Sequence, residues 1–470
     1  MSHADILRLA ARHRERLGDT LHDRVVEALY SEAGSIADKA VSREGQRSKW
    51  AFDLALDRIL TSKTLGIPAM ILLFGLAFWI TIAGANVPSA MLGDLLTVKV
   101  LGWLQAMAAA MGAPAWLSGF LIDGVYLSMA WVIAVMLPPM AIFFPLFTLL
   151  EDFGYLPRVA FNLDRAFSKA GAHGKQALSM MMGFGCNAAG VVATRIIDSP
   201  RERLIAILTN NFSICNGRWP TLILVGTIFI GATAPAALAS LVAAGSVVLI
   251  ALLGVIFTLL VSGALSKTVL KGETSAFTLE LPPYRPPRVL QTIYTSLLDR
   301  TMIVLWRAIV MAAPAGAVIW LISNIDVSGQ SIAYWVVSAL NPFGLLVGLN
   351  GIILLAYIVA IPANEIIIPT ILMLTLNLSK SALAQKGVML ELEENQVRDV
   401  LVGQGGWTLL TGINLMLFSL LHNPCSTTLL TIYRETGSKK WTFVAAALPI
   451  VLGLAVCFLT ASFFRLMGWV

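Results

Sequence analysis

The sequence predicts an all-α polytopic membrane protein in which two internal repeats contain broken or re-entrant helices. Of its 470 residues, 57% are hydrophobic and 13% are charged, whereas an ordinary soluble chain carries roughly 25% charged residues. Several uncharged runs reach about 18 residues or more, and each could cross a hydrocarbon layer of about 30 Å as a helix. A single water-soluble core is therefore excluded.

Charge and cysteine placement support this class. The formal net charge is +6, but the basic residues gather at the ends of apolar runs, a distribution that orients membrane spans. We therefore expect a lipid bilayer and no nucleic acid as partner. All four cysteines lie in apolar stretches, which indicates membrane thiols and not an extracellular disulfide framework: Cys186, Cys215, Cys425 and Cys457.

The chain divides into a preface and two membrane halves. Residues 1–63 are rich in charge, with apolar residues at helical spacing, so we expect a cytosolic helical segment and an N-terminus inside. The first membrane half is assigned to residues 64–300 and the second to residues 301–470. We expect seven full spans and two hairpins in all.

In the first half, a span is expected over residues 67–85, followed by an outer interfacial stretch at 88–125. A second uncharged run, 124–150, contains Pro138 and Pro139, which should break its helix. Residues 204–266 should hold two spans divided near 231–235. The proline-rich segment 267–300 should be a cytosolic connector.

Residues 176–194 carry no charge, yet both flanks are basic and three glycines lie in the middle. Both ends are therefore expected on the same side of the membrane. We predict a re-entrant hairpin of two half-helices, because irregular backbone at membrane depth must be covered by protein or a water-filled cavity.

In the second half, a span is expected over residues 308–325. The next span should be interrupted near Glu365 and its neighbouring prolines. The run 400–433 should be interrupted at residues 422–425, and the last span should cover 441–464. A mid-membrane glutamate is costly and demands a reason.

A shared pattern indicates an internal repeat. Cys186 is followed nine positions later by Arg195, and Cys425 nine positions later by Arg434. Each cysteine follows a helix-breaking residue and precedes a short apolar segment with a basic end. Duplicated halves with broken helices place a substrate site at the midplane between them.

The chemistry of the interruptions indicates the substrate class. Thiolate, amide and carboxylate ligands can replace the water shell of a divalent first-row metal, and sulfur selects its softer members. We therefore propose as metal ligands Cys186, Cys215, Cys425, Glu365, Asn187 and Asn216. Cys457 has apolar neighbours and is interpreted as a packing residue.

Other polar residues have two open interpretations. Glu365 could bind a cation or pair with Arg218. His422 lies three residues before Cys425, which suits a ligand pair, although Pro424 makes capping or packing equally suitable. Glu151 could serve a cytosolic exit or be solvated. The asparagines could line a pathway or connect helices by hydrogen bonds: Asn187, Asn210, Asn211, Asn216 and Asn364.

Six ordered motifs then carry a family resemblance: EDFGYLPR at 151–158, GFGCN at 183–187 with ATR at 193–195, CNGRWP at 215–220, ELPPY at 280–284, NPC at 423–425, and RETG at 434–437. From about residue 56 onward they resemble a divergent branch of the membrane domain of the bacterial ferrous iron transporter B (FeoB) family. That family has two gate-type repeats, and its motif cysteines match Cys186, Cys215 and Cys425.

The resemblance implies a bacterial inner-membrane permease, not an enzyme, with Fe²⁺ as transported substrate and no covalently bound cofactor. The chain lacks the phosphate-binding loop Gly-x-x-x-x-Gly-Lys-Ser/Thr, so we expect either a separate GTP-binding protein or a truncated version of the family protein. A small FeoA-like cytosolic partner and an oligomer are further expectations. The family usually has Ser-Ala-Arg after the second cysteine, where Asn216-Gly217-Arg218 stands here. Selectivity among iron, manganese and zinc is thereby open.

Two rival functions remain at this point. The first is a permease for a nucleoside-like organic solute, which Glu365 and the asparagines would bind by hydrogen bonds. The second is a membrane anchor that only recruits a GTPase through residues 1–63 and 267–300.

Overall fold

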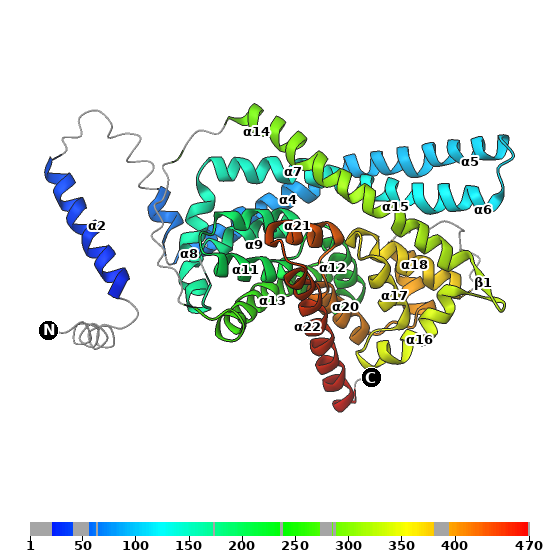
Figure 1. Cartoon of the computed structure of the whole chain (residues 1–470). Helices are drawn as coiled ribbons and strands as arrows, with labels where there is room; N and C mark the ends of the chain where they lie inside the picture. Colours follow the sequence, from blue (N-terminus) through cyan, green and yellow to red (C-terminus); the bar gives the residue numbers. More distant parts are fainter. Residues whose placement is uncertain are drawn as a thin grey trace.

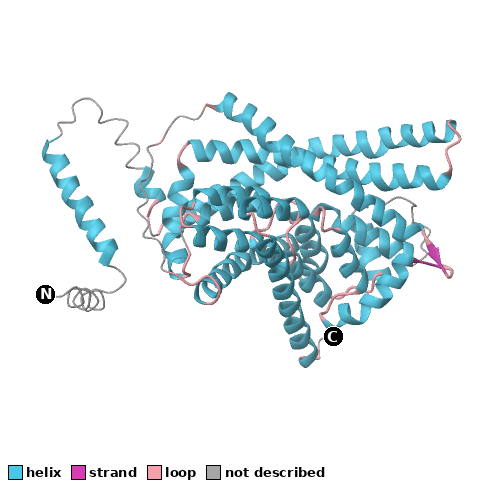
Figure 2. Cartoon of the chain, viewed as in Figure 1, coloured by secondary structure: helices cyan, strands magenta, loops and turns pink. Residues whose placement is uncertain are grey.

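The computed structural model describes residues 21–40, 56–62, 64–172, 174–235, 238–272, 284, 288–379 and 394–468. It is helical except for one two-stranded antiparallel ribbon, β1 (Asp326–Val327) and β2 (Gln330–Ser331), as Figure 2 shows. The all-α class is therefore confirmed.

The N-terminal preface contains the helix α2 (Leu21–Ala40), which lies apart from the bundle in Figure 1. Its apolar residues Val25, Leu29, Tyr30 and Ile36 are exposed. The helix expected in this segment is present over these residues, whereas residues 1–20 lie outside the described ranges.

Two long helices form an antiparallel arm. The first, Gly66–Ala110, is continuous over 45 residues and the second, Ala115–Asp152, over 38 residues. Figure 1 shows the arm extending away from the bundle at α5 and α6. In chain order its parts are α4 (Gly66–Gly93), a π-helical turn (Asp94–Val100), α5 (Leu101–Ala110), α6 (Ala115–Ser118), a π-helical segment (Gly119–Tyr126) and α7 (Leu127–Asp152).

The stretch at 88–125, expected to be interfacial, is helical apart from one short turn, and the scarcity of basic residues there bears on the side of the membrane and not on the backbone conformation. One expectation for this arm was wrong. The helix α7 continues through Pro138 and Pro139. It packs against α4 and α15, and neighbouring helices make prolines tolerable in membrane spans.

The rest of the first half is a series of short segments closed by one long helix. Its elements are α8 (Tyr155–Lys169), α9 (Gln176–Gly185), α10 (Asn187–Ala193) with a 3₁₀ turn (Thr194–Ile196), α11 (Pro200–Thr209) with a 3₁₀ turn (Asn210–Phe212), α12 (Trp219–Val225) with π and 3₁₀ turns (Gly226–Ile230, Gly231–Thr233), and α13 (Ala239–Lys267).

The break predicted within 176–194 is present. Cys186 is extended, with φ −151° and ψ 120°, and separates α9 from α10. The first of the two spans expected in 204–266 is broken as well, because the polar residues between α11 and α12 leave the helical conformation. Among the described residues of that range, only α13 is long enough to span.

The span predicted at 308–325 belongs to a longer helix that begins earlier in the chain. One helix of 36 residues, Val289–Asn324, replaces the span predicted at 308–325, so its N-terminal part lies within the predicted connector. The elements are α14 (Val289–Thr295), a π turn (Ser296–Met302), α15 (Ile303–Asn324), α16 (Ile332–Leu346), α17 (Gly351–Val359), a 3₁₀ turn (Asn364–Ile366), α18 (Ile367–Leu378), α19 (Glu394–Arg398), a π turn (Asp399–Gln404), α20 (Leu409–Leu421), α21 (Ser426–Thr436) and α22 (Lys439–Leu466).

The predicted interruptions of this half are present, between α17 and α18 and between α20 and α21. In addition, α16 and α17 meet at a bend of 111°. Within the described residues, six helices are long and apolar enough to cross a membrane, or seven if the bent pair counts as one span. The sequence predicts seven full spans and two hairpins, so the predicted number of spans is reached only if the bent pair is counted.

The broken helices lie at the centre of the bundle (Figure 1). In the most apolar window of Leu409–Thr436, 78% of residues are buried, against 19% in Gly66–Ala110 and 22% in Lys439–Leu466. The outer helices therefore shield the central breaks from lipid, which satisfies the requirement that irregular backbone at this depth be covered by protein.

One glycine of α13 makes such shielding possible and gives a test. A Cβ at Gly254 would clash with the backbone oxygen of Phe212, whereas a Cβ at Gly245 on the same helix would meet nothing within 4 Å. We expect Gly254→Ala to lower the midpoint of thermal unfolding, since overpacking costs roughly 1–3 kcal/mol. Gly245→Ala is the control and should leave the midpoint unchanged or raise it. Equal effects of the two variants would contradict this packing.

Candidate functional site

The chain breaks of both halves surround one small cavity. About 40 Å³ of it is open to the centres of water molecules, which is room for roughly three waters. All six proposed metal ligands line it, together with one of the proposed pathway residues: Cys186, Cys215, Cys425, Glu365, Asn187, Asn216 and Asn364.

Backbone hydrogen bonds hold these breaks against one another in pairs. Asn216 N donates to Gly185 O at 3.0 Å, which ties the Cys215 loop to the Cys186 break. Ser426 N donates to Ile361 O at 2.9 Å, and its hydroxyl to Pro362 O at 3.2 Å. The start of α21 is thus fixed to the break that precedes Glu365.

Arg218 joins the breaks of the two halves. Its side chain is completely buried and its guanidinium donates to five oxygens at 3.0–3.3 Å. These are the backbone carbonyls of Asn211, Leu420, His422 and Asn423 and the side-chain oxygen of Asn211. A cation therefore lies at the C-terminal end of α20, where the last helical carbonyls have no intrahelical partner.

A second polar chain crosses between the halves beside the cavity. Asn364 Nδ2 lies 3.7 Å from Cys215 Sγ, and Asn364 Oδ1 lies 3.0 Å from His422 Nε2. His422 is buried and does not line the cavity. The imidazole thus lies behind Asn364 and, in this structure, does not join Cys425 as a ligand pair.

The remaining proposed pathway residues lie elsewhere. Asn210 Nδ2 donates to Asn187 O at 2.9 Å, and Asn211 Nδ2 to His422 O at 2.6 Å. Both asparagines are buried and support the cavity from behind. Glu151 is exposed at the end of α7 and does not line the cavity.

Glu365 faces the cavity beside the Cys215 loop. Its carboxylate lies so close to Gly217 that a Cβ there would clash with it. Within the described ranges no ion pair joins Glu365 to Arg218, whose Nη1 and Nη2 groups donate to other oxygens. The buried pair considered from the sequence is therefore not formed.

The thiols share the cavity without forming a ready-made coordination sphere. Nowhere in the part of the chain that the structure describes do three side chains of His, Cys, Asp and Glu come close enough to hold a metal ion. The lining also includes residues that the sequence analysis missed. Thr427, Thr428, Met136 and Met140 line the cavity, and Thr428 Oγ1 lies 3.2 Å from Cys425 Sγ.

A signal for these residues was present in the sequence. The two threonines lie two and three residues after Cys425, so they fall on the first turn of the next helix. The two methionines lie four residues apart around the Pro138-Pro139 pair, on one helical face. Hydroxyl and thioether groups are weaker metal ligands than thiolate, imidazole or carboxylate, so their presence near a break is a weaker signal.

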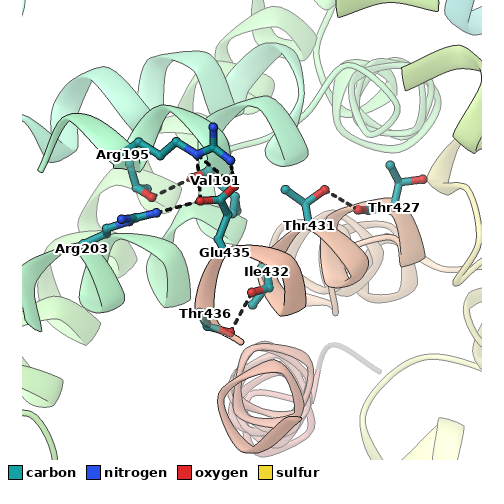
Figure 3. Close-up of polar contacts among 9 residues, drawn as sticks. Val191, Arg195, Arg203, Thr427, Thr431, Ile432, Glu435 and Thr436 are labelled. Atoms are coloured by element: carbon teal, nitrogen blue, oxygen red, sulfur yellow. Dashed lines mark hydrogen bonds and ion pairs between the residues drawn. The ribbon is translucent and has the colours of Figure 1, made fainter. Parts of the chain in front are cut away.

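An ion cluster joins the halves away from the cavity (Figure 3). Glu435 of α21 bonds Arg195 through both carboxylate oxygens, with contacts of 2.6–3.1 Å, and Arg203 at 2.7 Å. The Glu435 side chain is only 6% exposed. Arg195 and Arg434 occupy equivalent positions in the two repeats, and the residue that contacts Arg195 is Glu435, the neighbour of Arg434.

Family models match most of the region that contains these features. The model Gate, described as "Nucleoside recognition", matches residues 133–229 and 305–439, one part in each half. The model for the ferrous iron transport protein B C terminus matches residues 247–299. These are membrane segments of transporters, and no GTP-binding domain is among the matches.

Curated relatives point to the same family. The Fe(2+) transporter FeoB of Staphylococcus aureus (strain COL) is 30% identical over 87% of this chain and 59% of its own length. FeoB of Synechocystis is 26% identical over 88% and 63%. A Porphyromonas gingivalis Fe(2+) transport protein A/FeoB fusion protein is 25% identical over 86% and 50%.

No solved structure matches the chain. The chain spans between half and two thirds of the length of these relatives. With the Gate and FeoB C-terminal segments both present, it is a multi-pass membrane protein of the FeoB type that corresponds to the membrane region of those relatives.

Proposed function

We propose that the chain conducts ferrous iron across the bacterial inner membrane through the cavity between the two halves. The observation that carries the proposal is that Cys186, Cys215 and Cys425, from three separate chain breaks, line one cavity. Sulfur ligands combined with amide and carboxylate oxygens favour a soft first-row metal over Mg²⁺ or Ca²⁺.

The size of the cavity favours a metal ion over an organic solute. Its 40 Å³ accommodates an ion with a few waters, whereas pockets for small organic molecules are typically about 300–1,000 Å³. The separation of the thiols is compatible with transport, because an ion must bind well enough to enter and weakly enough to leave.

The remaining parts of the proposal concern organisation and partners. We assign the repeats to residues 64–300 and 301–470, with the N-terminal segment 1–63 in the cytosol, and the two separate Gate matches support this division. A separate GTP-binding protein and a FeoA-like chain are the proposed partners. The Porphyromonas gingivalis fusion of transport protein A with FeoB supports the second of these.

The cysteines give the most direct functional test. In proteoliposomes that contain the chain alone, we expect uptake of Fe²⁺ to exceed that of Mn²⁺, Zn²⁺ or a nucleoside. Cys186→Ser or Cys425→Ser should each lower Fe²⁺ uptake roughly tenfold or more, which is the size of loss typical when residues around a metal site are changed. Cys457→Ser is the matched control, since Cys457 is buried outside the cavity, and should transport normally.

Three outcomes of this assay would count against the proposal. Nucleoside uptake in place of metal uptake would favour the rival permease. Absence of any uptake by the folded chain would favour the anchor role. Equal losses in the Cys457 and Cys186 variants would show that the effect is structural.

Glu365→Gln gives an independent test of the cation route. The change keeps the shape of the side chain and removes its charge. Because the carboxylate faces the cavity and has no ion pair with Arg218 among the described residues, we expect at least a tenfold loss of Fe²⁺ uptake with an unchanged midpoint of thermal unfolding. Unchanged uptake would assign the residue a structural role, and loss of folding would indicate a buried ion pair.

A further inference from the structure

Two helices lead side by side from the cavity to the ion cluster of Figure 3. The helix α10 begins after Cys186 and α21 begins after Cys425, and both cysteines line the cavity. The helices pack against each other. Arg195 lies nine residues after Cys186, and Glu435 lies ten residues after Cys425, which is about 14 Å along each helix axis. The two side chains meet there.

Small and polar side chains dominate the buried residues of both helices. In α10 these are Asn187, Ala188, Gly190 and Val191, of which Asn187 and Gly190 lie against Asn210 of the first half. The buried face of α21 carries mainly threonines, Thr427, Thr428 and Thr431. Apolar burial stabilises by about 25 cal/mol per Å², so each of these small or hydroxyl-bearing side chains contributes little. The ion cluster adds a charged contact between the far ends of the two helices.

The geometry of the cluster suits a reversible contact. Glu435 is nearly enclosed at 6% exposure, while Arg195 is 64% and Arg203 32% exposed. Both arginines belong to the first half and the glutamate to the second. Water and salt can reach the arginines, so the cluster can open without exposing a deeply buried cation.

We propose that the Arg195–Glu435–Arg203 cluster is a latch that holds α10 against α21 and closes the cavity at that end. When the latch opens, the helices separate and Cys186 and Cys425 become accessible to water. The inference rests on the proposed function only in treating this access as a step of transport. Its test measures thiol access and requires no iron.

The experiment compares labelling rates of individual cysteines in the full chain, in lipid, with a small charged thiol reagent. Glu435→Gln keeps the side-chain size and removes the charge. We expect Cys186 and Cys425 to react about tenfold faster, equivalent to about 1.4 kcal/mol. Cys457 is fully buried outside the cavity and should stay protected, which reports an intact fold.

The matched control is Asp94→Asn, which removes the exposed ion pair with Lys99 in the helical arm and should leave every labelling rate unchanged.

Ionic strength adds a second measurement. Raising salt from about 0.1 to 1 M shortens the screening length from about 10 to 3 Å. It should accelerate labelling in the natural chain but not in the Glu435→Gln variant.

The proposal is overturned if Glu435→Gln leaves Cys186 and Cys425 at their original rates while Cys457 stays protected. It is also overturned if salt accelerates labelling equally with and without the Glu435 charge. If Cys457 also reacts in that variant, the fold is lost and Arg195→Gln decides, because that side chain is mostly exposed. This variant should give a smaller increase, as Arg203 remains, and an unchanged rate would overturn the latch.

Discussion

The buried guanidinium of Arg218 is the interaction on which the centre of this structure depends. Burying a lone cation costs several kcal/mol unless hydrogen bonds compensate it, and here five oxygens from the breaks of both halves do so. These include carbonyls at the end of α20 and in the extended segment that follows, which no helix can satisfy. The cation thus satisfies polar groups of the breaks that follow α11 and α20, and the surrounding helices cover them at membrane depth.

The same interaction determines the charge of the cavity. Because Arg218 donates to carbonyls, the carboxylate of Glu365 faces the cavity without that guanidinium as partner. Thiols, amides and one carboxylate then form a lining that is neutral or negative, as a path for a cation requires. The fixed breaks keep Cys186, Cys215 and Cys425 around a common space, while the helices that begin at two of them lead to the Arg195–Glu435 contact.

The sequence was informative where polar or helix-breaking residues interrupt an apolar run. Cys186, Glu365 and His422 were located in this way, and each lies at a break. The distribution of charge alone did not indicate where a helix ends. The span predicted at 67–85 therefore stops well short of the continuous helix 66–110. Partners far apart in sequence could not be predicted either. Arg195 contacts Glu435, which is 240 residues away in the sequence, and such a pairing depends on how α10 and α21 pack.

The central claim is that the three cysteines at these breaks contact a metal ion in transit. X-ray absorption spectroscopy at the iron edge, on the reduced chain loaded with Fe²⁺, tests it most directly. Sulfur and oxygen neighbours of the iron scatter the photoelectron differently and can therefore be told apart. We predict sulfur in the first shell of the iron, and its loss when Cys186, Cys215 and Cys425 are all replaced by serine. A shell of oxygen and nitrogen alone in the natural chain, or a sulfur signal that persists in the triple variant, would contradict the account.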